Sequence, residues 1–125
     1  MHVVYFDGAC NPNPGQCSYG VSLQKEGCEI DTSSSTCGHG TNNIAEYHGL
    51  IAAIQLATSH DLCNCEIRGD SQLVINQMTG KYKTKNKTLL LLQTIAQNMI
   101  NHSTCTFSLH HVKREFNSRA DELAK

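Results

Sequence analysis

The 125-residue sequence has no tryptophan, only two prolines and no long apolar run. A helix that crosses a membrane needs about 18 or more consecutive apolar residues, and no stretch here approaches that length. The first residues do not show the basic and then apolar pattern of a secretory signal, so we expect a cytoplasmic protein. Internal repeats and low-complexity linkers are also missing. These absences favour a single domain over residues 1–125.

Cysteine, by contrast, is abundant, with seven in the chain. Without a secretory signal, an odd number of cysteines favours reduced thiols over a disulfide framework, although one or two bridges stay open. A structural zinc site is the alternative, but Cys63-Asn64-Cys65 has the wrong loop for a zinc knuckle and Cys37-Gly38-His39 supplies only two further ligands. We therefore expect the cysteines to act mainly as small buried hydrophobic residues.

Charged residues are segregated along the chain, although the net charge is only −1. Residues 1–80 hold two basic and eight acidic side chains, a balance of −6, whereas residues 81–125 hold eight basic and three acidic ones, a balance of +5. Such a division suits a protein that binds divalent metal ions with one part and a polyanion with the other. Two solvated surfaces without a function are the simpler alternative.

Hydrophobic periodicity and turn residues predict an α/β domain that opens with three strands in a meander. The expected strands are 2–6, 17–23, 28–32, 65–69 and 104–111. The first expected helix follows an N-cap at Asn43, the second begins at Ser71 and stops at Gly80, the third runs from Thr88 to about Ile100, and a terminal helix follows a cap at Asn117 or Ser118. The polar tract 32–40, between the third strand and the first helix, is predicted to be a loop.

Acidic residues stand where predicted strands end. Asp7 follows the first apolar run, and Asp70 follows the fourth predicted strand. Strands joined by a helical crossover should lie parallel, so both acids should emerge at the edge where ligands of open α/β sheets gather. Glu46, on the crossover helix, shares a stripe with Gly49 and should face the sheet. A carboxylate in that position calls for a partner such as a metal ion.

Each acid also has a purely structural explanation. Asp7 can initiate a turn, Glu46 can complete a capping box with Asn43, and Asp70 can cap the next helix. Asp121 lies in the first turn of the terminal helix, where the helix dipole favours an acid. Each of these local roles explains only one acid, whereas a shared site would explain why all four acids are present.

Four local motifs together resemble the type 1 ribonuclease H family, over essentially the whole chain. They are Asp7-Gly8 with the following Asn-Pro-Gly turn, Thr41-Asn42-Asn43-Ile44-Ala45-Glu46, Gly69-Asp70-Ser71-Gln72 and Asn117-Ser118-Arg119-Ala120-Asp121. The pattern is most similar to compact archaeal and bacterial members. The resemblance implies an α/β, ribonuclease H-like fold: a five-stranded mixed sheet of three antiparallel strands and then two parallel to the first, flanked by helices. It also implies a hydrolase, an endonuclease that cuts the RNA strand of RNA/DNA hybrids and leaves 5′-phosphate and 3′-hydroxyl ends.

The resemblance further implies that Asp7, Glu46, Asp70 and Asp121 bind two Mg²⁺ ions, with Asp7 bridging them. Two metals about 3.5–4 Å apart can activate the attacking water and stabilise the leaving 3′-oxygen. Mg²⁺ prefers carboxylate oxygens, and Mn²⁺ can take its place. Carboxylates this crowded repel one another, so at least one should have a raised pKa without metal. Arg114 occupies a region where many members have a histidine, which suggests a role in catalysis or product release.

Substrate contacts are implied by the same resemblance. The expected contact residues are Gly8, Asn13, Thr41, Asn42, Gln72, Lys81 and Lys83. The amide side chains match positions that touch the minor groove of the hybrid, where 2′-hydroxyl groups distinguish RNA from DNA. Thr41 matches a phosphate contact. The basic protrusion with tryptophans found in larger members is absent, so the two lysines can replace it only in part and binding should be weak and salt-sensitive.

Two other functions stay open. A non-catalytic module that binds RNA/DNA hybrids would share these motifs, although the presence of all four acids speaks against it. A 3′-to-5′ exonuclease on a related fold is the second alternative, and the Asn-Pro-Gly turn and Thr41-Asn42-Asn43 speak against that one. We expect the chain to act as a monomer, and a domain of a longer protein is a variant of the same interpretation.

Overall fold

The computed structural model describes residues 1–125 and contains one mixed sheet. Its strands are β1 (His2–Asn11), β2 (Gly15–Lys25), β3 (Cys28–Gly40), β4 (Asn64–Gly69) and β5 (Thr106–His111). They lie in the order β3-β2-β1-β4-β5. The first three pair antiparallel, whereas β4 runs parallel to β1 and β5 parallel to β4. The predicted five-stranded mixed sheet is therefore confirmed.

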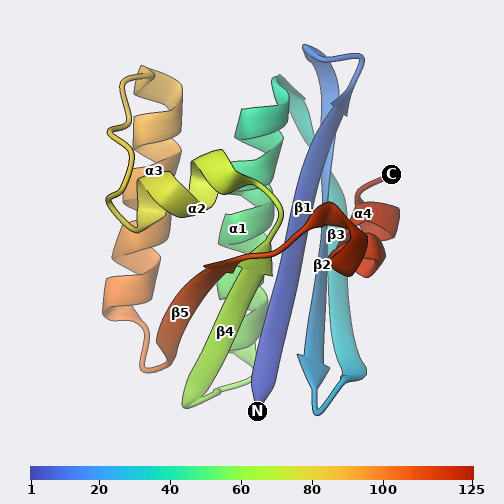
Figure 1. The fold of residues 1–125 in the computed structure, drawn as a ribbon, viewed down its shortest axis with the longest axis vertical. Helices are drawn as coiled ribbons and strands as arrows, with labels where there is room; N and C mark the ends of the chain where they lie inside the picture. The colour runs from blue at the N-terminus through green and yellow to red at the C-terminus, as the bar shows by residue number, and fades with distance from the viewer.

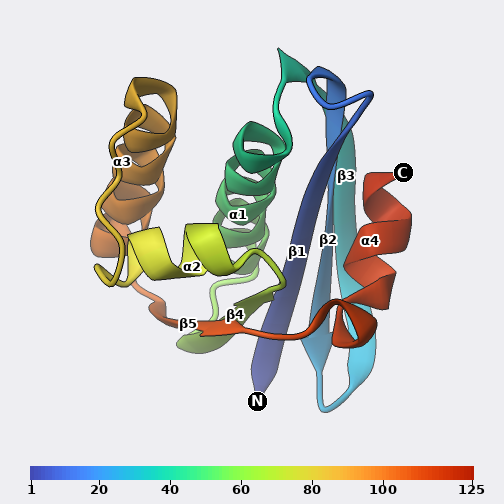
Figure 2. The same cartoon turned by 45° about the horizontal axis from the view of Figure 1, so that its top comes forward.

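Helices cover both faces of this sheet. They are α1 (Asn42–Ser59), α2 (Gln72–Met78), α3 (Lys87–His102) and α4 (Ser118–Ala124), with a short 3-10 helix, η1 (Arg114–Phe116), before α4. Figures 1 and 2 show α1 on one side of β1–β3 and α4 on the other, with α2 and α3 beyond α1. None of the helices is both long and apolar enough to span a bilayer.

The main core lies between α1 and the sheet. Val4 and Phe6 of β1 and Ile67 of β4 are fully buried and belong to one cluster with Tyr47 and Leu50 of α1. Each large apolar side chain buried in this way contributes about 1.5–3 kcal/mol to folding. The alternation of buried and half-buried residues along β1 and β4 thus sets which face α1 covers.

Two glycines allow α1 to approach β1 closely. A Cβ atom on Gly8 would lie 2.2 Å from the carbonyl carbon of Ala45, and one on Gly49 would lie 2.8 Å from the carbonyl oxygen of Asp7. Both distances are too short for a side chain, so these positions require glycine. The close approach brings the first turns of α1, which carry Glu46, next to Asp7.

The polar tract 32–40 differs from the sequence prediction. We expected a loop, but β3 continues through it to Gly40 and pairs with β2 along its length. β3 is an edge strand, so one side of its backbone bonds to β2 and its serine and threonine side chains need no apolar neighbour. Hydrophobic alternation does not reveal a polar edge strand, because that signal comes from a buried face.

β1 also continues beyond its predicted end. The strand was expected to stop at Phe6, with a turn directly after Asp7, but Asp7 pairs with Gly20 of β2 and the strand ends at Asn11. The antiparallel partner keeps β1 extended after its parallel pairing with β4 has ended, at Phe6 and Gly69. The other predicted strands, α2 and α3 match to within two residues at each end.

The cysteines do not all behave as expected. Cys10 and Cys17 form a disulfide between opposite residues of β1 and β2, which is within the one or two bridges that the sequence left open. Antiparallel pairing brings such side chains together, and the register that aligns them is not visible in cysteine spacing. Cys65 and Cys105 are buried thiols, as expected. The exposed thiols, contrary to expectation, are Cys28 and Cys63.

Candidate active site

Parallel pairing brings Asp7 and Asp70 to the same place in the sheet. The pairing of β1 with β4 ends at Phe6 and Gly69, so each acid is the next residue along its chain. Figure 1 shows β4 ending beside the middle of β1. Carboxylate oxygens of Asp7, Glu46 and Asp70 all lie within 4.8 Å of one another. The predicted meeting of these three acids is confirmed.

Glu46 reaches the two aspartates from α1. The N-cap of this helix is Thr41, whose hydroxyl accepts the Ile44 N–H, so Asn43 does not form the alternative capping box with Glu46. The Glu46 carboxylate instead accepts the Gly8 N–H at 2.6 Å, and the residue is only 7% exposed. Helix capping therefore does not explain Glu46, and its burial beside other acids calls for a cation.

Asp121 lines the same hollow but lies outside the tight group of three. Two cationic groups contact its carboxylate: Lys125 Nζ is 3.2 Å from Oδ2, and Arg114 Nη2 is 3.6 Å from Oδ1. The hollow has a volume of about 310 Å³ and is lined by Asp7, Gly8, Ala9, Asn42, Glu46, Asp70, Arg114 and Asp121. The structure thus gathers all four predicted acids and Arg114 around one space.

Burial and crowding shift the pKa values of these acids. Burial, and then the charge of Asp70, raise the pKa of Asp7 to about 7. Burial and the neighbouring Asp7 raise the pKa of Glu46 to about 10. Burial also acts to raise the pKa of Asp121, but hydrogen bonding with Asp7 and Lys125 outweighs it and holds this pKa below its usual value. The raised pKa expected of crowded carboxylates is found at Asp7 and Glu46.

The donor set fits a divalent cation. Each of the three converging carboxylates can supply an oxygen, the ligand type that Mg²⁺ and Mn²⁺ prefer. A bound cation would favour their ionised forms and so offset the repulsion that raises their pKa values. No cysteine or histidine lines this hollow, and a hard cation needs neither.

Comparisons with known proteins lead to the same family as the motifs. The reverse transcriptase-like family profile matches residues 5–125. Ribonuclease HI of Halobacterium salinarum is 40% identical over 121 residues, which cover 96% of this chain and 60% of that protein. The chain belongs to the ribonuclease H family.

Solved structures from the ribonuclease H family share the fold. The crystal structure of RNase H1 from Halobacterium salinarum aligns with a TM-score of 0.93 and 38% identity, covering 98% of this chain and 93% of that one. LC11-RNase H1, solved in complex with an RNA/DNA hybrid, aligns with a TM-score of 0.92 and 35% identity, covering 99% and 94%. The chain spans 60% of the length of the Halobacterium relative and 34% of a bifunctional protein of Mycobacterium tuberculosis.

Four of the seven residues that the ribonuclease H resemblance assigns to substrate line the acid hollow or the polar hollow beside it: Gly8, Asn13, Thr41 and Asn42. Asn42 lines both this hollow and a neighbouring polar one of about 570 Å³, which Asn13 and Thr41 also line. The Asn42 N–H donates to Asn13 Oδ1 at 3.1 Å, and Asn42 Oδ1 accepts the Cys10 N–H at 2.9 Å. The other three assigned residues, Gln72, Lys81 and Lys83, are exposed and line neither hollow.

Some residues around the site were not predicted. Lys125 contacts Asp121 at the i,i+4 spacing, which the sequence shows. Asn86 and Thr88 line the polar hollow from the start of α3, and only the packing of α3 against α1 brings them there. Asn117 was considered as a helix cap, but its side chain makes no capping hydrogen bond and reaches β1 instead.

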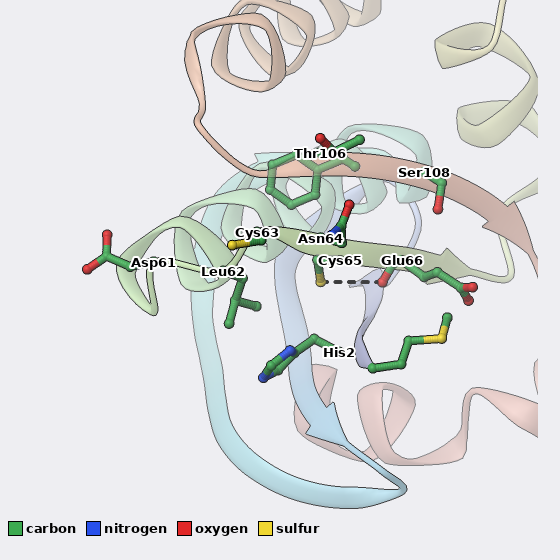
Figure 3. A pocket seen from close by; sticks show the side chains of 11 residues that line it. His2, Asp61, Leu62, Cys63, Asn64, Cys65, Glu66, Thr106 and Ser108 are labelled. Atoms are coloured by element: carbon green, nitrogen blue, oxygen red, sulfur yellow. Dashed lines mark hydrogen bonds between the residues drawn. The ribbon is translucent and has the colours of Figure 1, made fainter.

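A larger hollow, of about 630 Å³, lies at the opposite end of β4 from the acids. Figure 3 shows Cys63, Cys65 and His2 among the side chains around it, set apart from one another. These residues do not converge as metal ligands; the acids Asp7, Glu46 and Asp70 are the only such group in the protein. Size therefore does not distinguish the candidate active site, whereas its ligand geometry does.

Proposed function

We propose that this member of the ribonuclease H family is an endonuclease that hydrolyses the RNA strand of RNA/DNA hybrids. The observation that carries the proposal is the convergence of Asp7, Glu46 and Asp70 within 4.8 Å, with Asp121 lining the same hollow. The relative LC11-RNase H1, with the same fold, was solved with such a hybrid. We assign the acids to two divalent ions, Mg²⁺ or Mn²⁺, and expect 5′-phosphate and 3′-hydroxyl products.

The four acids would hold the ions, and the rest of the chain orients the acids. Two divalent ions supply an activated water and stabilise the charge on the leaving 3′-oxygen. The Gly8 N–H holds one Glu46 oxygen at 2.6 Å and so fixes the direction of that carboxylate. Hydrogen bonding with Asp7 and Lys125, and then the charge of Arg114, keep the pKa of Asp121 low, so this carboxylate is ionised and able to act as a ligand. Arg114 is exposed, so its guanidinium group can also leave the Asp121 carboxylate and bind a phosphate of the substrate.

Recognition of the RNA strand falls to uncharged side chains next to the acids. Asn13 and Asn42 border the polar hollow, and their amides can bond 2′-hydroxyl groups in the minor groove. We assign Gln72 to the same role and Thr41 to a phosphate. Lys81 and Lys83 would attract the backbone without reading sequence. The proposal takes residues 1–125 as one domain that works as a monomer in the cytoplasm.

Cleavage of an end-labelled RNA/DNA hybrid tests this function. Matched RNA/RNA, DNA/DNA and single-stranded RNA controls are run with Mg²⁺, with Mn²⁺ and with chelator. We expect metal-dependent internal cuts in the RNA of the hybrid, and Asp7→Asn should lower the rate at least ~10³-fold, which is about 4 kcal/mol of transition-state stabilisation. The matched control is Asp61→Asn, an exposed acid at the other end of the sheet, which should cleave normally.

The same assay separates the alternatives. Hybrid binding without cleavage in either metal would overturn catalysis and leave a binding module. Products shortened stepwise from an unblocked 3′ end, with no internal cuts when that end is blocked, would identify an exonuclease.

A further inference from the structure

Asn117 is the most deeply buried polar residue near the acids, and it lies just before α4. The residue is 1% exposed. Its side-chain Nδ2 donates to the carbonyl oxygen of Phe6 at 2.8 Å, across 111 residues of sequence. Its own carbonyl oxygen accepts the Asp121 N–H at 3.1 Å. One residue therefore bonds the peptide group directly before Asp7 and the backbone of Asp121.

These two bonds join the start of α4 to β1 at the residue directly before Asp7. Asp7 belongs to a central strand, whereas Asp121 belongs to a helix of seven residues at the end of the chain. α4 is also fastened at its far end, where the Ser18 hydroxyl donates to the Ala124 carbonyl, and by ion pairs of Arg119 with Glu29. Those contacts anchor the helix to β2 and β3. Apart from the hydrogen bonding between the Asp7 and Asp121 carboxyl groups themselves, the Asn117 amide is the side-chain hydrogen bond that ties the start of α4 to the strand that carries Asp7.

The environment of Asn117 suggests that geometry, and not stability, accounts for the residue. Its Oδ1 atom is buried without any hydrogen-bond partner. Leaving a buried acceptor unpaired opposes folding, and natural proteins break such local rules mainly at functional sites. An amide is uncharged, so it supplies the donor for the Phe6 carbonyl without adding a charge beside the four acids.

We propose that Asn117 is a positioning residue that sets the separation of Asp7 and Asp121 and thereby the metal affinity of the acid hollow. The inference rests on the proposed function, because it assumes that these two acids hold divalent ions. Asn117 is buried and is not expected to touch the substrate. It acts through the backbone at Phe6 and through the first turn of α4.

Two substitutions remove the donor in different ways. Asn117→Leu keeps the approximate size of the side chain without a donor, whereas Asn117→Ala removes the side chain. Ser18→Ala is the matched control, because it removes a different hydrogen bond between α4 and the sheet, at the end of the helix opposite to Asn117. Circular dichroism and urea unfolding identify the temperature at which all the variants are folded for the remaining measurements.

Two readouts separate positioning from a general loss of structure. Because small misplacements of reacting groups are costly, we expect kcat to fall about 30-fold to 100-fold in both Asn117 variants while KM for the hybrid changes less than about twofold. Mn²⁺ binding without substrate, measured by calorimetry, should weaken about tenfold in both variants, a change of about 1.4 kcal/mol. Ser18→Ala should retain wild-type kcat and Mn²⁺ affinity.

Each result decides the proposal. Wild-type Mn²⁺ affinity in either folded Asn117 variant overturns it, as does a Ser18→Ala variant that loses as much affinity and kcat as they do. If Asn117→Ala does not fold, Asn117→Leu carries the test alone. Failure of the proposed function is recognised separately: the wild-type protein would then not cleave hybrid, and the Mn²⁺ titrations would still show whether Asn117 organises the acids.

Discussion

The two ends of β4 offer two hollows of opposite character. The hollow at its amino end is about twice as large, about 630 Å³ against about 310 Å³, and is bordered by Cys63, Cys65 and His2. The hollow at its carboxyl end holds three converging acids, two of them with raised pKa values. Buried like charges oppose folding, so an arrangement that maintains them requires a function. Concentrated charge, and not volume, identifies the site.

The largest difference between the two ends should appear on neutralising one glutamate at each. Glu46→Gln keeps the size of the side chain but removes a metal ligand, and we expect turnover to fall about 10³-fold, or about 4 kcal/mol. Glu66→Gln, at the amino-end hollow, should change turnover less than about twofold. Steady-state cleavage of the hybrid measures both. Equal losses in the two variants would show that the ends do not differ in function.

Stability of the metal-free protein should depend on pH in the direction set by the acid hollow. The folded-state pKa values of Asp7 and Glu46 lie above their unfolded values, so the folded protein binds more protons than the unfolded chain and loses stability as pH rises. Between pH 5 and 8 we expect a loss of about 3 kcal/mol from Asp7 alone, because its folded pKa of about 7 lies two units above pH 5 and each unit is worth about 1.4 kcal/mol; Glu46 adds a further loss in the same direction. Asp121, with its lowered pKa, changes the pH dependence of stability only at lower pH.

Urea unfolding in chelator at several pH values measures this dependence. Mg²⁺ should restore stability more at pH 8 than at pH 5, because it binds the ionised carboxylates. In Asp7→Asn the free energy of unfolding should change less with pH than in the wild-type protein. A wild-type stability that does not change between pH 5 and 8 would contradict the crowding of the acids.

The cysteines also differ between the two regions, because Cys63 and Cys65 at the amino-end hollow are free thiols, whereas Cys10 and Cys17 form a disulfide. The Cys10–Cys17 disulfide joins β1 to β2 beside the loop that carries Asn13, and it closes a loop with a sequence separation of 7. Reduction by a dithiol should destabilise the protein by about 2 kcal/mol through the entropy of the unfolded chain. The double variant Cys10→Ser, Cys17→Ser should be insensitive to reductant. An unchanged urea midpoint in the wild-type protein after complete reduction, checked by mass spectrometry, would argue against this stabilising effect.

The smallest effect should come from the basic loop between α2 and α3. Lys81 and Lys83 are exposed and make no ion pair. Replacing both by alanine should raise KM about threefold to tenfold and reduce the salt dependence of binding by about one unit of logarithmic slope for each lost phosphate contact. Lys25→Ala, at the far end of β2, is the control and should change neither. A salt slope unchanged in the double variant would remove this loop from the substrate path.

Much of the fold and of the site could be predicted from short stretches of sequence. Asp7 and Asp70 were each predicted to follow a strand; in the structure each follows the stretch over which β1 and β4 pair in parallel, and this pairing brings them to one place in the sheet. The helical stripe shared by Glu46 and Gly49 correctly predicted a carboxylate facing the sheet, since side-chain direction follows from the helical period. These features depend on neighbours within a few residues, which is the range over which local sequence determines conformation.

Other features required the tertiary structure. The polar half of β3 is a strand only because β2 supplies its hydrogen-bond partners, and Cys10 meets Cys17 only because the β1–β2 register places them opposite each other. Asn117 looks like a helix cap in sequence, yet its amide bonds a carbonyl 111 residues away. The sequence by itself thus determined which acids, strands and helices the protein has. Tertiary structure decided the contacts between distant segments, because register and packing depend on the whole chain and leave no local signal.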